Sequence, residues 1–150
     1  MVQCPPMGGL CVKEKQGKAA FARTFGMAAL LWAALAAGSS LLVPGAVEAP
    51  AGAAGVLRSC LVLPVVEELV FRGAVLRCLQ PLGRNTAILG QALLFAALHG
   101  SLQAKAYALG MGLIFGWAAD RAGSLLPGLL LHLLNNGVVL AKCLAERGRP

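Results

Sequence analysis

Three stretches of this sequence contain no charged residue and are long enough to cross a lipid bilayer. They are residues 24–47, 85–104 and 122–141. A helix needs about 20 predominantly apolar residues to cross the hydrocarbon core of a bilayer. These runs constrain the fold strongly, and no strand-like alternation of apolar and polar residues is evident in the sequence. The sequence therefore predicts helices rather than an open sheet.

The composition agrees with a chain surrounded by lipid. Hydrophobic residues make up 58% of the 150 residues and charged residues only 13%, against roughly 45–50% and about 25% in an ordinary soluble domain. A chain of this length can bury a large core in water, but charge is depleted further than burial alone requires. We expect membrane lipid to cover much of the surface.

The excess of basic residues does not indicate a nucleic-acid partner. Thirteen Lys and Arg against six Asp and Glu give a formal charge of +7, which in a soluble protein would suggest one. Here the basic residues precede the first apolar run or fill the gaps between runs, as in loops that face lipid headgroups. The aromatic residues lie inside the runs, so no base-stacking surface is predicted.

The predicted fold is all-α, a polytopic transmembrane helix bundle of about five membrane helices. A cleavable signal peptide is the alternative for the first run, although its apolar part is longer than the usual 7–15 residues. Gly112 and Gly116 have the spacing that lets two helices approach closely. The predicted segments are a basic N-terminus (1–23), a transmembrane helix (24–47), a linker rich in Ala, Gly and Pro (48–55), a core (56–144) and a polar tail (145–150). Within the core we expect helices at 56–79, 85–104, 106–119 (short or tilted) and 122–141.

Two adjacent glutamates lie where lipid should exclude them. Glu67 and Glu68 fall in the middle of an apolar stretch, and an ionisable group at membrane depth costs roughly 2.5–3.5 kcal/mol on the insertion scale. Glu68 and Arg72 are four residues apart, so they can form an ion pair on one helix face. Glu67 points about 100° away, toward a different neighbour. One carboxylate is then structural and the other free for chemistry, unless both are solvated at a helix end.

Both histidines of the chain also lie within apolar runs. His99 and His132 belong to different predicted helices. Asn136 is four residues after His132 and on the same face, whereas Asn135 is displaced from that face by one step. These side chains and the glutamates could converge on one polar cavity. The alternative is that the histidines are separate core residues with satisfied hydrogen bonds.

Glutamate, histidine and asparagine together are suited to hydrolysis. A buried carboxylate can take a proton from water, a histidine can relay it, and His or Asn N–H groups can stabilise an oxyanion. His99, His132 and a glutamate could also bind zinc and leave a fourth position for water. The zinc-protease motif H-E-x-x-H is absent. The residues alone leave the metal undecided.

Read in order, these residues resemble the CPBP family of intramembrane proteases. The family includes the Ras-converting CAAX endopeptidase and the bacterial Abi or bacteriocin-processing proteins. The resemblance covers about residues 56–144. Its three motifs are E-E-x-x-x-R at Glu67, Glu68 and Arg72, F-x-x-x-H at Phe95 and His99, and H-x-x-x-N at His132 and Asn136.

The resemblance implies an intramembrane endopeptidase. By this likeness Glu67 is the general base, assisted by His99. Glu68 and Arg72 organise the site together with Phe95. His132 and Asn136 stabilise the tetrahedral oxyanion. Substrates in the family are membrane-associated peptides, in one branch the C-terminal tripeptide after a prenylated cysteine. The glutamate mechanism requires no cofactor, whereas the family's metalloprotease naming keeps zinc as an alternative.

Other functions remain open at this point. A non-catalytic membrane scaffold or assembly factor could retain the protease fold, and buried Glu and His also occur in proton-coupled carriers. Members of the family commonly carry several helices before the first motif, and this chain has one, so a partner subunit or self-association could complete the site. A bacterial plasma membrane and a plastid or other organelle membrane suit the composition equally.

Overall fold

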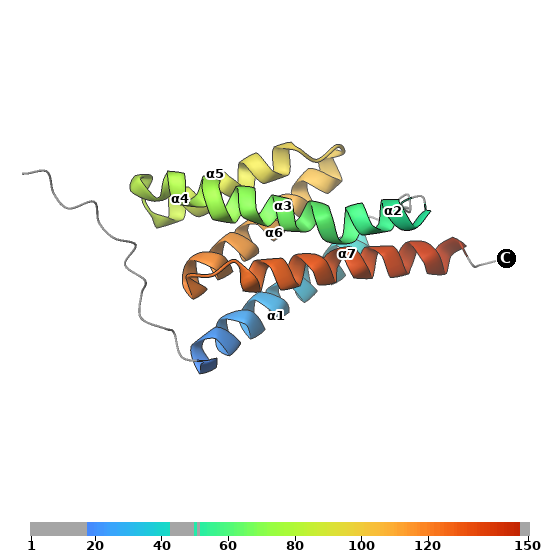
Figure 1. Ribbon diagram of the computed structural model, residues 1–150, viewed down its shortest axis with the longest axis horizontal. Coiled ribbons are helices and arrows are strands. Elements are labelled where there is room, and N and C mark those ends of the chain that lie inside the picture. The colour runs from blue at the N-terminus through green and yellow to red at the C-terminus, as the bar shows by residue number, and fades with distance from the viewer. Residues whose placement is uncertain (1–17, 43–49, 51, 148–150) are drawn as a thin grey trace, which may run out of the picture.

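The computed structural model describes residues 18–42, 50 and 52–147, and this part of the chain is all-helical, without a strand. The all-α prediction is confirmed. Figure 1 shows the helices packed as a bundle. They are α1 (Lys18–Leu42), α2 (Gly52–Leu57), η1 (Arg58–Val62), α3 (Leu63–Glu68), η2 (Leu69–Val75), α4 (Leu76–Leu79), η3 (Gln80–Leu82), α5 (Arg84–Ala97), α6 (Leu102–Ala122) and α7 (Leu126–Arg147).

The elements from α2 to α4 form one continuous helix, which we call the 52–79 helix. The backbone stays right-handed helical at each junction, and η1 and η2 are π-helical stretches within it. Pro64 lies just after η1 and has no N–H to donate. In the π pattern of η1 the N–H of Leu63 bonds to the carbonyl of Arg58. The two π stretches flank the glutamate pair, and such stretches are frequent at functional sites.

The 52–79 helix runs antiparallel to α7, and the two lie side by side in Figure 1. Gly128 of α7 packs directly on Glu68, because a Cβ at this position would come within 2.7 Å of the Glu68 carboxylate. Contacts between the two helices pair rising residue numbers on one with falling numbers on the other: Ser59 with Asn136, Glu68 with His132 and Gly73 with Leu125.

The region after the 52–79 helix differs from the prediction. The expected span 85–104 is wrong as one helix, since α5 ends at Ala97 and a new helix, α6, begins at Leu102. Ser101 caps α6 by accepting the N–H of Ala104, which is the ordinary role of serine at a helix start. The apolar content of the run hides this break. The expected short helix 106–119 is wrong in its bounds, since α6 runs from Leu102 to Ala122. Gly123, whose φ is 60°, forms the left-handed cap that follows it.

The N-terminal helix starts before the predicted span and packs on the core. α1 begins at Lys18 rather than at residue 24, and residues 43–47 of that span lie outside the described residues. Part of the predicted linker, from Gly52 onward, is helical. Phe25, Trp32 and Leu35 of α1 pack against the cluster that contains Met111 and Phe115 of α6. α1 is therefore a wall of the bundle.

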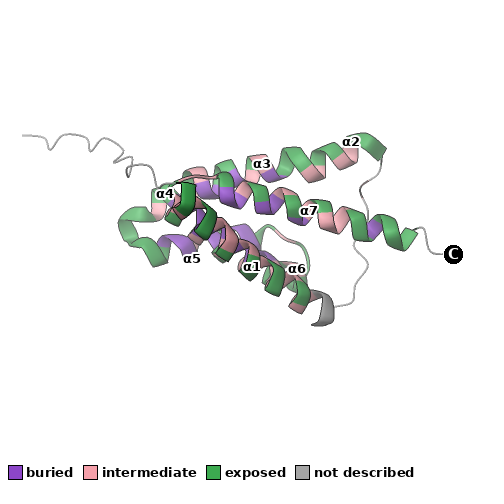
Figure 2. Ribbon diagram, turned by 90° about the horizontal axis from the view of Figure 1, so that it is seen from below, coloured by how far each residue is buried: buried purple, intermediate pink, exposed green. Residues whose placement is uncertain are grey.

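Two of the described helices, α1 over Lys18–Ser39 and α7, are long and apolar enough to cross a membrane by length and composition. α5 has 14 residues, about 21 Å of helix, which is shorter than a hydrocarbon core of about 30 Å. Large apolar side chains lie on the outside, such as Leu30 at 73% exposure and Leu102 at 80%. The exposed surface in Figure 2 runs along the outer faces of the helices.

Gly112 sets the distance between α5 and α6. A Cβ there would lie 2.9 Å from both Cα and Cβ of Ala92. We predict that Gly112→Ala pushes the two helices apart and lowers the free energy of unfolding by about 1–3 kcal/mol. The matched control is Gly137→Ala, where a Cβ would meet nothing within 4 Å. Thermal unfolding in detergent checks this, and equal melting temperatures for the two variants would contradict it.

Candidate active site

A buried ion pair lies at the centre of the bundle. Arg72 Nη1 is 3.0 Å from Glu68 Oε1, and both side chains are almost fully buried. This confirms the predicted pair at i, i+4. The guanidinium carbon of Arg72 also lies 4.6 Å from the ring centre of Phe95 and 5.6 Å from that of Phe115. The cation is thus stabilised by one carboxylate and by two aromatic faces.

His132 joins both glutamates. Its Nδ1 is 2.9 Å from Glu68 Oε1 and its Nε2 is 3.4 Å from Glu67 Oε2. The expectation that Glu67 faces a different neighbour is therefore wrong. The two carboxylates do diverge around the helix, but the two nitrogens of an imidazole lie on different edges of the ring. One ring placed against the helix can therefore meet both.

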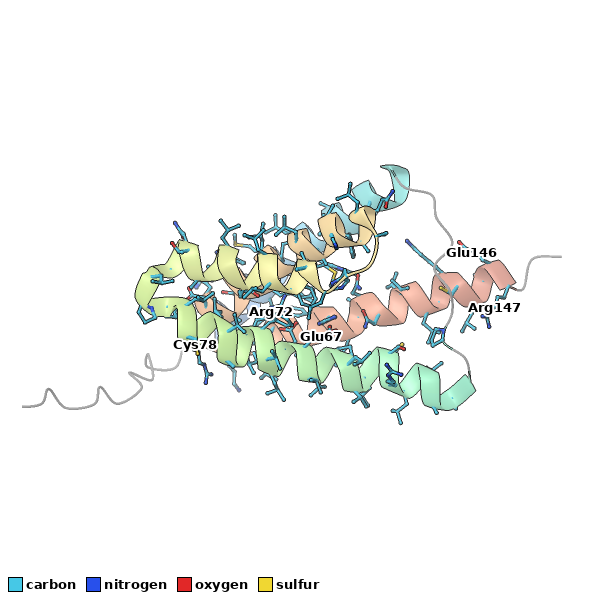
Figure 3. All side chains as sticks on the ribbon, turned by 90° about the horizontal axis from the view of Figure 1, so that it is seen from above. Glu67, Arg72, Cys78, Glu146 and Arg147 are labelled. Carbon is cyan, nitrogen blue, oxygen red and sulfur yellow. The ribbon has the colours of Figure 1, made fainter. Side chains whose placement is uncertain are left out.

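The two carboxylates differ in access to their surroundings. The side chain of Glu67 is 31% exposed, whereas that of Glu68 is 1% exposed. Figure 3 shows Glu67 and Arg72 in the middle of the bundle, far from Glu146 and Arg147 at the end of α7. Gly128 leaves room for the inner carboxylate, Glu68, against α7. Only Glu67 of the pair can meet water or a substrate without unpacking the core.

His99 contacts Phe95, which in turn contacts His132. Its Nδ1 lies 3.1 Å from the carbonyl oxygen of Phe95. A carbonyl only accepts, so Nδ1 carries the hydrogen and Nε2 of the neutral ring keeps its lone pair. The Phe95 ring lies 4.9 Å from the His99 ring and 5.9 Å from the His132 ring, centre to centre. Phe95 therefore contacts both histidines, and within the described residues His99 makes no direct contact with Glu67.

Asn136 lies one turn along α7 from His132, on the same side, about 6 Å away along the helix axis. Its Nδ2 donates to the carbonyl of Ser59 at 2.9 Å, and its Oδ1 accepts from Asn135 at 3.1 Å. A π-helical carbonyl at Ser59 would accept from residue 64, which is a proline without an N–H. The amide of Asn136 satisfies that carbonyl instead.

Three hydrogen-bonding residues were not predicted to contribute. Trp32 Nε1 and the Tyr107 hydroxyl both donate to Asn135 Oδ1, at 3.1 and 2.7 Å. Helical spacing alone places Asn135 off the face of His132, and neither aromatic residue belongs to the predicted site. The sequence feature that could have indicated them is that a Trp N–H or a Tyr O–H within an apolar run still needs a hydrogen-bond partner.

Zinc is not favoured by this arrangement. Among the described residues no group of three His, Cys, Asp or Glu side chains is gathered to hold a metal ion. Both nitrogens of His132 face carboxylates, and Nδ1 of His99 is used by a backbone carbonyl. The expected zinc set of His99, His132 and a glutamate does not converge among the described residues.

A pocket of about 270 Å³ opens beside Asn136, between the start of the 52–79 helix and the second half of α7. It is lined by a mixture of apolar and weakly polar side chains: Pro50, Ser59, Cys60, Asn136, Val139, Leu140 and Cys143.

Removing the buried cation tests how far the site depends on it. We predict that Arg72→Met leaves Glu68 without its cation and lowers the free energy of unfolding by about 3–5 kcal/mol. Arg77→Met is the control, because Arg77 is exposed on the same helix. Chemical unfolding in detergent measures both variants, and a loss below about 1 kcal/mol for Arg72→Met would show that the pair is dispensable.

The comparisons with known proteins assign the chain to a family. Residues 48–138, more than half of the chain, match the family described as Type II CAAX prenyl endopeptidase Rce1-like. No curated protein and no solved structure matches the chain. The matched segment begins before the 52–79 helix and ends within α7, and so contains all three motifs and the Glu67–His132–Glu68 group. The chain therefore belongs to the Rce1-like family of type II CAAX prenyl endopeptidases.

Proposed function

We propose that this chain is a multi-pass intramembrane endopeptidase that hydrolyses a peptide bond with water activated by Glu67. The observation that carries the proposal is the partly exposed carboxylate of Glu67, whose Oε2 lies 3.4 Å from Nε2 of His132. That ring is held in turn by the buried Glu68–Arg72 pair. A carboxylate with access to water beside a rigid imidazole is an arrangement suited to general base catalysis. Family membership supports the same reaction class.

In the proposed reaction Glu67 removes a proton from water as the oxygen attacks the peptide carbonyl. His99 assists by accepting a hydrogen bond from that water at Nε2, the ring nitrogen that is not used by the Phe95 carbonyl. The carbonyl oxygen becomes an oxyanion, stabilised by the amide of Asn136 and by His132, whose Nε2 edge is released as the Glu67 carboxylate takes up the proton. When the C–N bond breaks, Glu67 returns the proton to the leaving amine, so the carboxylate is regenerated.

The proposed substrate is a peptide presented at the membrane, of which a prenylated C-terminal CAAX sequence is the example that the family name provides. The apolar exterior would let a lipidated substrate approach from the bilayer. The pocket beside Asn136 is next to the proposed oxyanion site and could accept an apolar part of that substrate. A partner subunit or a second copy could add further walls.

The role of Glu67 as the general base is tested by replacing its carboxylate with an amide of the same shape. We predict that Glu67→Gln lowers kcat for a prenylated peptide in proteoliposomes by at least about 100-fold, because an amide cannot take the proton. His99→Ala and His132→Ala should also abolish cleavage while the protein still accumulates in the membrane. Glu146→Gln, exposed near the end of α7, is the control. Undiminished cleavage by Glu67→Gln would refute the mechanism.

Metal dependence is tested separately. We predict that protein stripped with a chelator, and shown to be metal-free by elemental analysis, cleaves the peptide at the rate of untreated protein. Loss of activity that returns when Zn²⁺ is added back would replace the glutamate mechanism with a zinc mechanism.

A further inference from the structure

We propose that Trp32, Tyr107 and Asn135 are positioning residues, which orient the amide of Asn136 for the proposed hydrolysis. The inference rests on the proposed function and extends it to α1, a helix that precedes the segment matched by the family. None of the three touches the reacting atoms in the mechanism above. They act through one chain of hydrogen bonds that ends at Asn136.

The amide of Asn135 has only one orientation. Its Oδ1 accepts from Trp32 Nε1 at 3.1 Å and from the Tyr107 hydroxyl at 2.7 Å. An amide oxygen has two lone pairs, and both are used here. Turning the amide over would place its NH₂ group against the indole donor. The Nδ2 of Asn135, which is a buried residue, is therefore held on the opposite side, toward Asn136.

Asn135 in turn orients the amide of Asn136. Asn135 Nδ2 donates to Asn136 Oδ1 at 3.1 Å, so the oxygen of Asn136 must lie on that side. The Nδ2 of Asn136 then donates to the carbonyl oxygen of Ser59 at 2.9 Å. That carbonyl has no backbone donor, because Pro64 lacks an N–H. Reversing Asn136 would break both bonds. The second N–H of Nδ2 has no partner among the described residues and remains available for an oxyanion.

The chain of bonds connects helices that are far apart in the sequence. It begins on α1 and α6, passes through α7 and ends on η1 of the 52–79 helix. An oriented amide stabilises a transition-state charge without reorganising during the reaction, which is the condition for efficient oxyanion stabilisation. α1 thus contributes to the site through the indole N–H of Trp32, besides covering the core.

The test is a double-mutant cycle between Tyr107→Phe and Asn136→Ala, with prenylated-peptide cleavage in proteoliposomes as the readout. Tyr107→Phe removes one hydroxyl and should lower kcat about 5- to 10-fold with KM unchanged, in line with one hydrogen bond. In the Asn136→Ala background the same change should alter kcat less than 2-fold. A residue that acts only on stability would lower kcat by the same factor in both backgrounds. That result would overturn the proposal.

The contribution of α1 is tested by the two tryptophans of the chain. Trp32→Phe should lower kcat as Tyr107→Phe does. Trp117→Phe is the matched control, because the partly buried Trp117 packs in the core and its N–H makes no hydrogen bond to a described residue. Equal kcat for the two tryptophan variants would overturn the role of α1. A wild-type chain that cleaves no peptide would instead refute the proposed function, and the positioning role with it.

Discussion

The buried contact between Glu68 and Arg72 is the interaction on which the rest of the site depends. Separated, either charge would be unpaired inside a medium of low dielectric, at a cost of several kcal/mol. Paired at 3.0 Å, with the cation also over the Phe95 ring, they form a rigid anchor. His132 is oriented by this anchor through Nδ1, and its other nitrogen then faces Glu67.

Close approach of the 52–79 helix and α7 brings His132 to this anchor. Gly128 allows α7 to reach the Glu68 carboxylate, and the antiparallel register places His132 beside both glutamates and Asn136 beside Ser59. The π-helical stretches on either side of the pair interrupt the regular hydrogen-bond pattern. The irregularity at Ser59 is compensated by the side chain of Asn136 from the neighbouring helix, so the local backbone hydrogen-bond pattern and the tertiary packing are coupled.

Much of the site could be predicted from spacing, because an α-helix has a fixed period. The Glu68–Arg72 pair follows from four residues of separation, and the structure confirms it. The break between α5 and α6 could not be found from apolarity, since α5 ends at Ala97 and Ser101 caps α6 inside one uninterrupted charge-free run. The contact between Glu67 and His132 could not be predicted either. The angle of about 100° between adjacent side chains on one helix does not indicate which side chain of another helix lies between them.

By itself the sequence determined that the chain is helical and apolar, that its few acids and histidines lie inside apolar runs, and that three motifs occur in the order of one protease family. These are local properties, set by composition and by the 3.6-residue period. Only the tertiary structure decided that His132 bridges both glutamates, that His99 is joined to them through Phe95, and that Trp32 of α1 is connected to Asn136. Such contacts depend on the register between helices and on glycines that permit close approach. The register cannot be read from the sequence of one helix alone.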